Sequence, residues 1–182
     1  MKQLVLLSFA VCVASPAETV AIINARIVPV SAPTIERGTL LIENGKIAAV
    51  GQKISIPSGS RRIDASGLSI YPGWIDGWTR IGLVEISGVG PTVDTTELGL
   101  YNPAAQAWIA VNPHSEMIKT ARVNGITTAL VAPAGGRISG VASAINLAGK
   151  YPDRMAILKN AGIVINIPSI YQPSPRPFDA PT

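Results

Sequence analysis

A change of pattern at Pro72 divides this sequence of 182 residues into two parts that should fold differently. Before Pro72, short runs of β-branched and aliphatic residues alternate with turn residues, which predicts a small unit built of strands. After Pro72, runs typical of strands alternate with runs typical of helices, which is the pattern of a parallel α/β architecture. The sequence therefore predicts a small β-domain over residues 18–71 and an α/β part over residues 72–167.

A hairpin is the clearest feature of the first part. Its two strands are expected at residues 39–43 and 46–50, because Asn44-Gly45 between them supplies the two positive φ angles of a type I′ turn. Further extended segments are expected at 19–23, 26–30, 62–63 and 69–70. Together these segments predict a small sheet.

A helix followed directly by a strand is the clearest feature of the second part. The sequence predicts that Asn112 caps the helix, with Pro113 at the first helical position, where its missing N–H costs nothing. Asn124-Gly125 ends the helix, and a strand at 126–131 follows. A third strand, parallel to the others, is expected at 163–167.

The first 17 residues have the features of an export signal. Lys2 provides the positive start, residues 4–14 form an apolar run, and Ser15-Pro16-Ala17 places small residues before a cleavage at Glu18. The run is shorter than the roughly 20 apolar residues of a membrane span, although an anchor or a first core strand stays open as an alternative. We therefore expect an exported protein, periplasmic or extracellular, with no attachment to the membrane once residues 1–17 are removed.

Charge and composition exclude some classes of protein. The net charge is +4, from 15 basic and 11 acidic residues, and the basic residues are scattered rather than clustered. A nucleic-acid-binding surface needs a clustered basic footprint, so we expect no nucleic-acid partner. A hydrophobic content of 47% indicates a chain with a core to bury, except in the proline-rich segment 168–182, which is expected to be an extended tail.

The segment Pro72-Gly-Trp-Ile-Asp-Gly-Trp-Thr-Arg80 resembles the strand that opens the barrel of the amidohydrolase superfamily, P-G-x-I-D-x-H-x-H. Residues 21–28, 38–51 and 121–131 are similar to further segments of metal-dependent, imidazolonepropionase-like members, in the same order. The resemblance implies an α/β fold with a small N-terminal β-domain and the start of a TIM-type (β/α)8 barrel. Such a barrel takes about 200–250 residues, so it is incomplete in this chain.

The same resemblance implies a hydrolase of carbon–nitrogen bonds other than peptide bonds, with a divalent metal, typically zinc. Trp78 and Arg80 stand where that family has the two metal-binding histidines. An indole offers only a donor, and a guanidinium has no acceptor lone pair, so neither binds a cation. The family's later ligands come from strands that this chain does not contain. We therefore expect no catalytic residue, no metal ligand and no cofactor within this chain, and whether it is an enzyme stays open.

Asp76, Trp78 and Arg80 are the candidate substrate-binding residues. Alternate residues of a strand share one face, so these three side chains are expected to converge at the mouth of the barrel. The alternative is that Asp76 and Arg80 form an ion pair, capped by the tryptophan, in the space of a former metal site. This alternative is favoured.

The other residues that could form a functional site give weaker indications of one. His114 is the single histidine, and one imidazole does not make a metal site, so it is expected to face solvent or to cap the helix. Glu85, Asp94 and Glu97 follow the first barrel strand and are interpreted as surface carboxylates. Gly135–Gly140 lacks the Lys-Ser/Thr ending of a phosphate loop and is interpreted as a turn.

Two functions compete. The first is the N-terminal part of an exported amidohydrolase-superfamily hydrolase, inactive alone, whose partners are the remainder of the barrel or a homologous subunit, and a small-molecule substrate. The alternative is a non-catalytic exported binding or assembly module, a pseudoenzyme that has lost the metal site. A fragment without a function of its own is the third interpretation.

Overall fold

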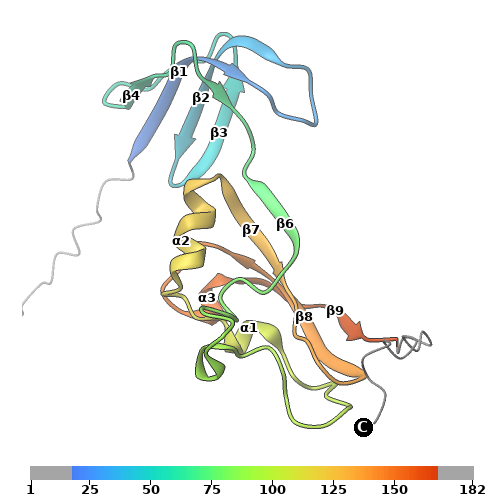
Figure 1. Cartoon of the computed structure of the whole chain (residues 1–182). Coiled ribbons are helices and arrows are strands. Elements are labelled where there is room, and N and C mark those ends of the chain that lie inside the picture. Colours follow the sequence, from blue (N-terminus) through green and yellow to red (C-terminus); the bar gives the residue numbers. More distant parts are fainter. Residues whose placement is uncertain (1–17, 168–182) are drawn as a thin grey trace, which may run out of the picture. The chain divides into compact units, whose positions relative to one another are not determined.

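A computed structural model describes residues 18–167 of the chain (Figure 1). These residues fall into two compact units, one ending at Pro72 and the other beginning at Gly73. The expected export signal and the expected proline-rich tail lie outside the described residues. Each unit has its own sheet and its own buried cluster.

The first unit is a sheet of five strands: β1 (Thr19–Ile27), β2 (Ile35–Glu43), β3 (Lys46–Gly51), β4 (Arg61–Asp64) and β5 (Ser69–Ile70). The strand order is β3-β2-β1-β4, and β5 pairs with β1. Neighbours β1, β2 and β3 are antiparallel, whereas β4 and β5 run parallel to β1. One face buries a small apolar cluster of Ala25, Ile27, Leu40 and Ala65.

The predicted hairpin is confirmed. Glu43 pairs with Lys46, and Asn44 and Gly45 have φ angles of 53° and 71°, as a type I′ turn requires. The expectation of separate strands at 19–23 and 26–30 is wrong, because β1 runs continuously from Thr19 to Ile27. The pairing of β1 with β2 shifts in register between Ile22 and Ala25. Asn24 lies in this shift with a φ of 61°, a conformation that asparagine tolerates better than most residues.

The second unit is a four-stranded sheet with short helices. Its strands are β6 (Trp74–Thr79), β7 (Ile126–Val131), β8 (Ile138–Asn146) and β9 (Ala156–Ile165), in the order β6-β7-β8-β9. Its helical elements are η1 (Gly90–Thr92), α1 (Ala107–Ala110), α2 (Glu116–Val123) and α3 (Pro152–Met155). The fold is thus a mixed sheet with few helices (Figure 1).

Strands β6 and β7 are parallel, and the chain between them includes α2. The strand predicted at 126–131 is confirmed at both ends. Gly73 permits the close start of β6, because a Cβ there would lie 2.2 Å from side-chain atoms of Thr127. The first two strands of the α/β part therefore have the predicted direction.

The third parallel strand expected at 163–167 is wrong. Strand β9 ends at Ile165 and pairs antiparallel with β8, which in turn pairs antiparallel with β7. The connection Ala132–Arg137 is too short for a parallel crossover, which needs a dozen or more residues. Gly135 and Gly136, with φ angles of 81° and 59°, turn the chain straight back. The turn expected at Gly135–Gly140 is therefore shorter than predicted, since β8 begins at Ile138.

The core of the second unit joins the sheet to the helices. Its buried cluster consists of Leu83, Ala107, Val111, Ile118, Ala129, Val131, Ile145, Leu147 and Met155. Removing a large aliphatic side chain of this kind from water contributes about 1.5–3 kcal/mol. Ile118 brings α2 into the cluster, and the cluster thereby fixes α2 beside β7.

Candidate functional site

The candidate residues Asp76, Trp78 and Arg80 lie in the second half of β6 and directly after it, and β6 is the first strand of its sheet. Trp78 is 62% exposed, Arg80 is exposed, and Asp76 is half-buried. The Oδ1 atom of Asp76 accepts a hydrogen bond from the backbone N–H of Trp78 at 3.2 Å. This contact fixes the Asp76 carboxylate against its own strand.

A β-bulge interrupts β6 between Asp76 and Thr79. Asp76 pairs with Ala129 and Thr79 pairs with Val131, so β6 has one residue more than β7 in this interval. Such a bulge re-aims the side chains around it and breaks the alternation of faces. Asp76 and Thr79 therefore take neighbouring positions on the face of the buried Ala129 and Val131, and simple alternation does not align Asp76 with Trp78.

The favoured alternative, an ion pair between Asp76 and Arg80, is wrong. The ion pairs that the structure shows within residues 18–167 join Arg26 to Glu36, Arg61 to Glu18, Lys119 to Glu116 and Arg154 to Asp153. The hydrogen bond from Trp78 holds the Asp76 carboxylate near the bulge instead. Both charged groups thus remain without an ion-pair partner in the described part of the chain.

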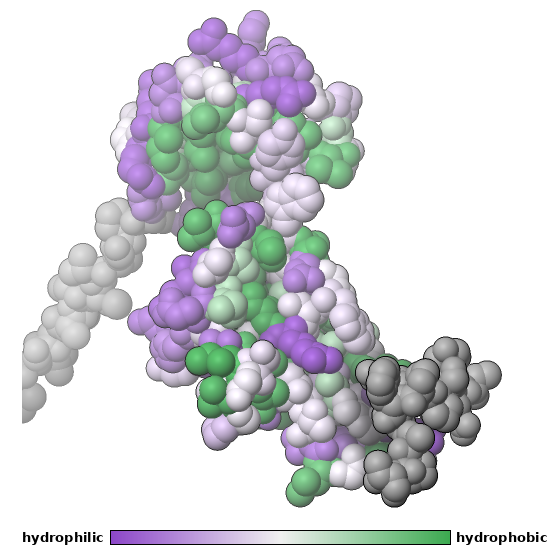
Figure 2. Space-filling model, viewed as in Figure 1, coloured by the Kyte–Doolittle hydropathy of each residue, from purple (hydrophilic) through white to green (hydrophobic). Residues whose placement is uncertain are grey.

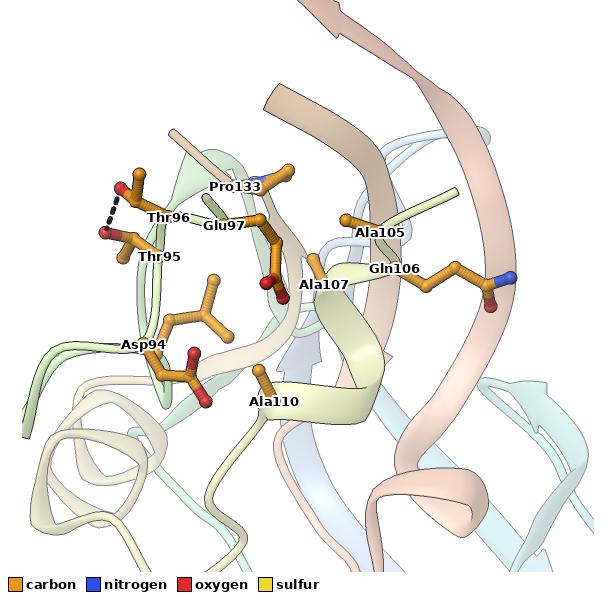
Figure 3. Close-up of a pocket in the computed structure, with 10 residues that line it drawn as sticks. Asp94, Thr95, Thr96, Glu97, Ala105, Gln106, Ala107, Ala110 and Pro133 are labelled. Carbon is orange, nitrogen blue, oxygen red and sulfur yellow. Dashed lines mark hydrogen bonds between the residues drawn. The ribbon is translucent and has the colours of Figure 1, made fainter. Parts of the chain in front are cut away.

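A small cavity lies between the segment after β6 and the helix α1 (Figure 3). Its volume is about 30 Å³, and Leu83, Ala107, Ala110 and Pro133 contribute apolar lining. Asp94 and Glu97 line it with their carboxylates, which point toward α1 in Figure 3. A cavity of this size holds water rather than an organic substrate.

Backbone hydrogen bonds hold the segment that follows β6 in place beside this cavity. The N–H of Asp94 donates to the carbonyl of Leu83, and the N–H of Ala134 donates to the carbonyl of Thr95. The hydroxyls of Thr95 and Thr96 lie 3.4 Å apart. The interpretation of Asp94 and Glu97 as surface carboxylates is confirmed, since both residues are exposed. The cavity that they also line was not predictable, because nothing in the sequence shows that the segment folds back on Pro133.

A larger groove lies beside Arg80. It has a volume of about 400 Å³ and is lined by Thr79, Arg80, Ile81, Val84, Met117, Thr120 and Ala121. The three residues from α2 are spaced i, i+3 and i+4, so they form one stripe of the helix. The lining of the groove is mostly apolar, and Arg80 is its single charged residue.

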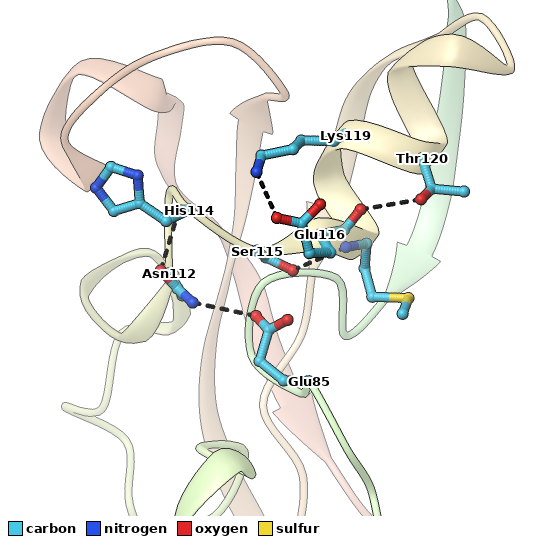
Figure 4. Close-up of polar contacts among 8 residues, drawn as sticks. Glu85, Asn112, His114, Ser115, Glu116, Lys119 and Thr120 are labelled. Atoms are coloured by element: carbon cyan, nitrogen blue, oxygen red, sulfur yellow. Dashed lines mark hydrogen bonds and ion pairs between the residues drawn. The ribbon is translucent and has the colours of Figure 1, made fainter.

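The N-terminus of α2 carries a network of polar contacts (Figure 4). The expected cap at Asn112 is wrong, since Ser115 is the N-cap and its Oγ accepts from the N–H of Met117 at 3.2 Å. Asn112 instead stabilises the preceding turn: its Oδ1 accepts from the N–H of His114, and its Nδ2 donates to Glu85. His114 itself is exposed.

The described residues do not fit a catalytic metal ion. No group of three or more His, Cys, Asp or Glu side chains within 18–167 is arranged to hold one. The hydroxyls of two buried serines are used in hydrogen bonds to the backbone: Ser139 donates to the carbonyl of Gly135, and Ser143 donates to that of Lys159.

No helix within residues 18–167 is long and apolar enough to cross a membrane.

The fold is one that a solved hydrolase shares. The chain superposes on an amidohydrolase from Thermotoga maritima with a TM-score of 0.74 and 24% sequence identity, over 80% of this chain and 38% of that one. At this identity the likeness shows the fold alone. The described residues therefore have the fold of an amidohydrolase. Their mixed sheets match the N-terminal part of that fold.

Similarity in sequence to named proteins is more specific than the shared fold. A deacetylase from Agrobacterium fabrum is 36% identical over 88 residues, a dihydroorotase from Geobacter metallireducens is 49% identical over 37, and an imidazolonepropionase from Saccharopolyspora erythraea is 38% identical over 42. These regions are 42%, 20% and 23% of this chain but only 22%, 9% and 11% of the relatives. No protein-family model matches. The chain is thus similar to several named members of the amidohydrolase superfamily, which supports the resemblance seen in the sequence, and it spans a small part of the relatives' length.

Proposed function

We propose that this chain forms the N-terminal part of an exported hydrolase that acts on carbon–nitrogen bonds other than peptide bonds. The observation that carries the proposal is the similarity to proteins named deacetylase, dihydroorotase and imidazolonepropionase. The fold shared with the Thermotoga amidohydrolase supports it. The substrate would be a small molecule with an amide or cyclic amide bond.

On this proposal β6 and β7 are the first two strands of a (β/α)8 barrel. Two features support the assignment: the strands are parallel, and the chain between them forms α2, which packs on β7. In such barrels the chemistry lies at the C-terminal ends of the strands, and Asp76, Trp78 and Arg80 occupy that end of β6. The remaining strands would come from the remainder of the barrel or from a homologous subunit.

The chain alone would be inactive. The superfamily's hydrolysis would depend on a bound divalent metal ion, and Trp78 and Arg80 offer no lone pair that could hold one. Within this chain, Asp76, Trp78 and Arg80 would contact substrate rather than metal. Arg80 would supply a positive charge to a carboxylate or carbonyl oxygen, and Trp78 an apolar surface.

Translation of the DNA beyond the codon for Thr182 tests this proposal. An in-frame continuation with histidines and an aspartate at strand ends is expected. The extended protein should then hydrolyse a cyclic amide or an N-acetylated amine, whereas the 182-residue chain should not. A stop codon after Thr182, or turnover by the chain alone, would contradict the proposal.

A second function, a non-catalytic exported binding or assembly module, is favoured by one observation. The tryptophan at the first histidine position is 62% exposed, and the arginine at the second is exposed as well. Exposed aromatic side chains and arginines are enriched where proteins bind one another. Loss of the metal would then coincide with a gain of contact surface on the same strand.

Export is part of both proposals. The motivation is the sequence of Lys2, the apolar run and Ser15-Pro16-Ala17. Intact-mass analysis of secreted or periplasmic material should show Glu18 as the first residue. Recovery of the protein from the cytoplasm with Met1 intact would refute export.

A further inference from the structure

Two Asn-Gly dipeptides occur in the chain, and the structure gives them different surroundings. Asn44-Gly45 forms the turn between β2 and β3, and Asn124-Gly125 follows the end of α2 (Figure 1). Asparagine is a thermolabile residue, and it is most reactive before glycine, because glycine has no Cβ to hinder attack by its backbone nitrogen on the asparagine side chain. Because the two dipeptides are chemically identical, any difference in their reactivity must come from their neighbours.

Asn44-Gly45 makes few contacts. Both residues are exposed, and a Cβ placed on Gly45 would meet no atom within 4 Å. Within residues 18–167, the structure shows no hydrogen bond from the side-chain amide of Asn44 or from the backbone N–H of Gly45. Figure 2 shows hydrophilic residues over much of the first unit, to which this turn belongs. Water therefore reaches both groups that would react.

Asn124-Gly125 is held by three hydrogen bonds. The Nδ2 atom of Asn124 donates to the carbonyl of Thr120 at 2.9 Å. The N–H of Gly125 donates to the carbonyl of Arg122 at 2.9 Å, and the carbonyl of Gly125 accepts from the N–H of Trp74 at 2.9 Å. Attack on the side chain of Asn124 by the nitrogen of Gly125 would require the loss of the first two of these bonds.

We propose that Asn44 undergoes spontaneous deamidation and that the fold protects Asn124 from the same reaction. The backbone nitrogen of Gly45 gives up its proton to the solvent and forms a bond to Cγ of Asn44, which closes a five-membered succinimide ring. The bond between Cγ and Nδ2 breaks, and Nδ2 leaves as ammonia after taking a proton from the solvent. No oxidant or enzyme takes part, and water is the only reactant besides the chain.

Water then opens the succinimide ring at one of its two carbonyl carbons. Opening at Cγ gives aspartate, whereas opening at the backbone carbonyl carbon gives isoaspartate, in which the main chain passes through the side chain. The net reaction consumes one water molecule and releases one ammonia molecule. Either product carries one new carboxylate, so the net charge of the chain falls from +4 (15 − 11) to +3 (15 − 12).

The two products should affect the hairpin differently. Asp-Gly adopts the same type I′ turn as Asn-Gly, so the aspartate product fits. The isoaspartate product adds a main-chain carbon to a two-residue turn that joins the paired residues Glu43 and Lys46. It should therefore weaken the pairing of β3, which is the edge strand in the order β3-β2-β1-β4. The inference goes beyond the proposed function, because it needs no substrate, no metal ion and no further strand of a barrel.

Incubation of the full chain at mildly alkaline pH, followed by digestion with trypsin, tests the proposal. Trypsin cuts after lysine and arginine, so peptide 38–46 contains Asn44 as its single asparagine and peptide 123–137 contains Asn124 as its single asparagine. Mass spectrometry should show that Asn44 deamidates faster than Asn124 by about tenfold or more, because two hydrogen bonds protect Asn124. Synthetic peptides with aspartate or isoaspartate identify the product by their elution.

The same incubation in denaturing urea is the control for the fold, since both dipeptides should then react at similar rates. Asn44→Gly retains the turn, because Gly-Gly also favours type I′, and should largely remove the acidic form of the chain in ion-exchange chromatography. Equal rates in the folded chain, an unreactive Asn44, or a difference that persists unchanged in urea would each overturn the proposal. None of these measurements depends on hydrolysis of a substrate, so the hydrolase proposal stands or falls separately.

Discussion

The ammonium group of Lys159 lies over the indole ring of Trp108, 4.0 Å from the ring centroid. This cation–π contact joins β9 to α1, two elements that are far apart in the sequence. The indole N–H of Trp108 donates to Gln106 at 2.6 Å, which fixes the ring beside the lysine. Together the two contacts attach the short helix α1 to the edge of the sheet.

Replacing Lys159 by Met should destabilise the second unit slightly. A cation–π contact at an exposed position contributes about 0.5–1 kcal/mol, and Lys159 is exposed. Lys159→Arg should retain the contact and the stability. Urea unfolding followed by tryptophan fluorescence measures both variants, and an equal loss in the two would show that the cation is not responsible.

Replacing Ser115 by Ala should destabilise α2. The Oγ of Ser115 accepts the N–H of Met117, and loss of such a cap costs about 0.5–2 kcal/mol, whereas a glycine at the same position costs only a few tenths. Ser115→Gly is therefore the control. The free energy of unfolding should decrease from the unmodified chain to Ser115→Gly and then to Ser115→Ala. A reversed order of the two variants would argue against capping.

Stability should fall in acid through Asp64. Hydrogen bonds from the side chain of Asn24 and from Ser66 hold the pKa of Asp64 below its ordinary value of 3.8. A carboxyl whose pKa is lowered by folding stabilises the protein above the unfolded value, and this contribution is lost as pH falls through the folded value. Asp64→Asn should therefore be less stable at neutral pH, and the difference should vanish well below pH 3.8.

The cause of this shift can be tested directly. Asn24→Gly keeps a residue that tolerates a φ of 61° and removes the first hydrogen-bond donor. The pKa of Asp64, measured by side-chain NMR titration, should then rise toward its ordinary value. An unchanged pKa would assign the effect to Ser66.

The purified protein should bind no zinc tightly. Catalytic zinc takes three protein ligands, and the described residues hold no group of three suitable side chains. Trp78→His combined with Arg80→His should create at most a weak site, because two imidazoles are too few and the bulge separates their positions from regular alternation. Elemental analysis after dialysis checks both proteins, and near-stoichiometric zinc in the unmodified chain would contradict this expectation.

Local chemistry determined several elements from the sequence alone. Asn44-Gly45 specifies its turn because few other residue pairs adopt two positive φ angles, so the hairpin β2–β3 was predictable. The strand at 126–131 was predictable as well, since Asn124-Gly125 ends the helix immediately before a run of β-branched and aliphatic residues. The superfamily was recognisable because its segments recur in order.

Only the tertiary structure decided how the strands of the second unit pair. The periodicity of a strand carries no information about the direction of its neighbour, so the antiparallel return of β8 and β9 was missed. The same holds for the bulge of β6, which arises from pairing with β7 and moves Asp76 away from simple alternation with Trp78. The cavity of Asp94 and Glu97 likewise depends on long-range contacts with Pro133, which no local pattern encodes.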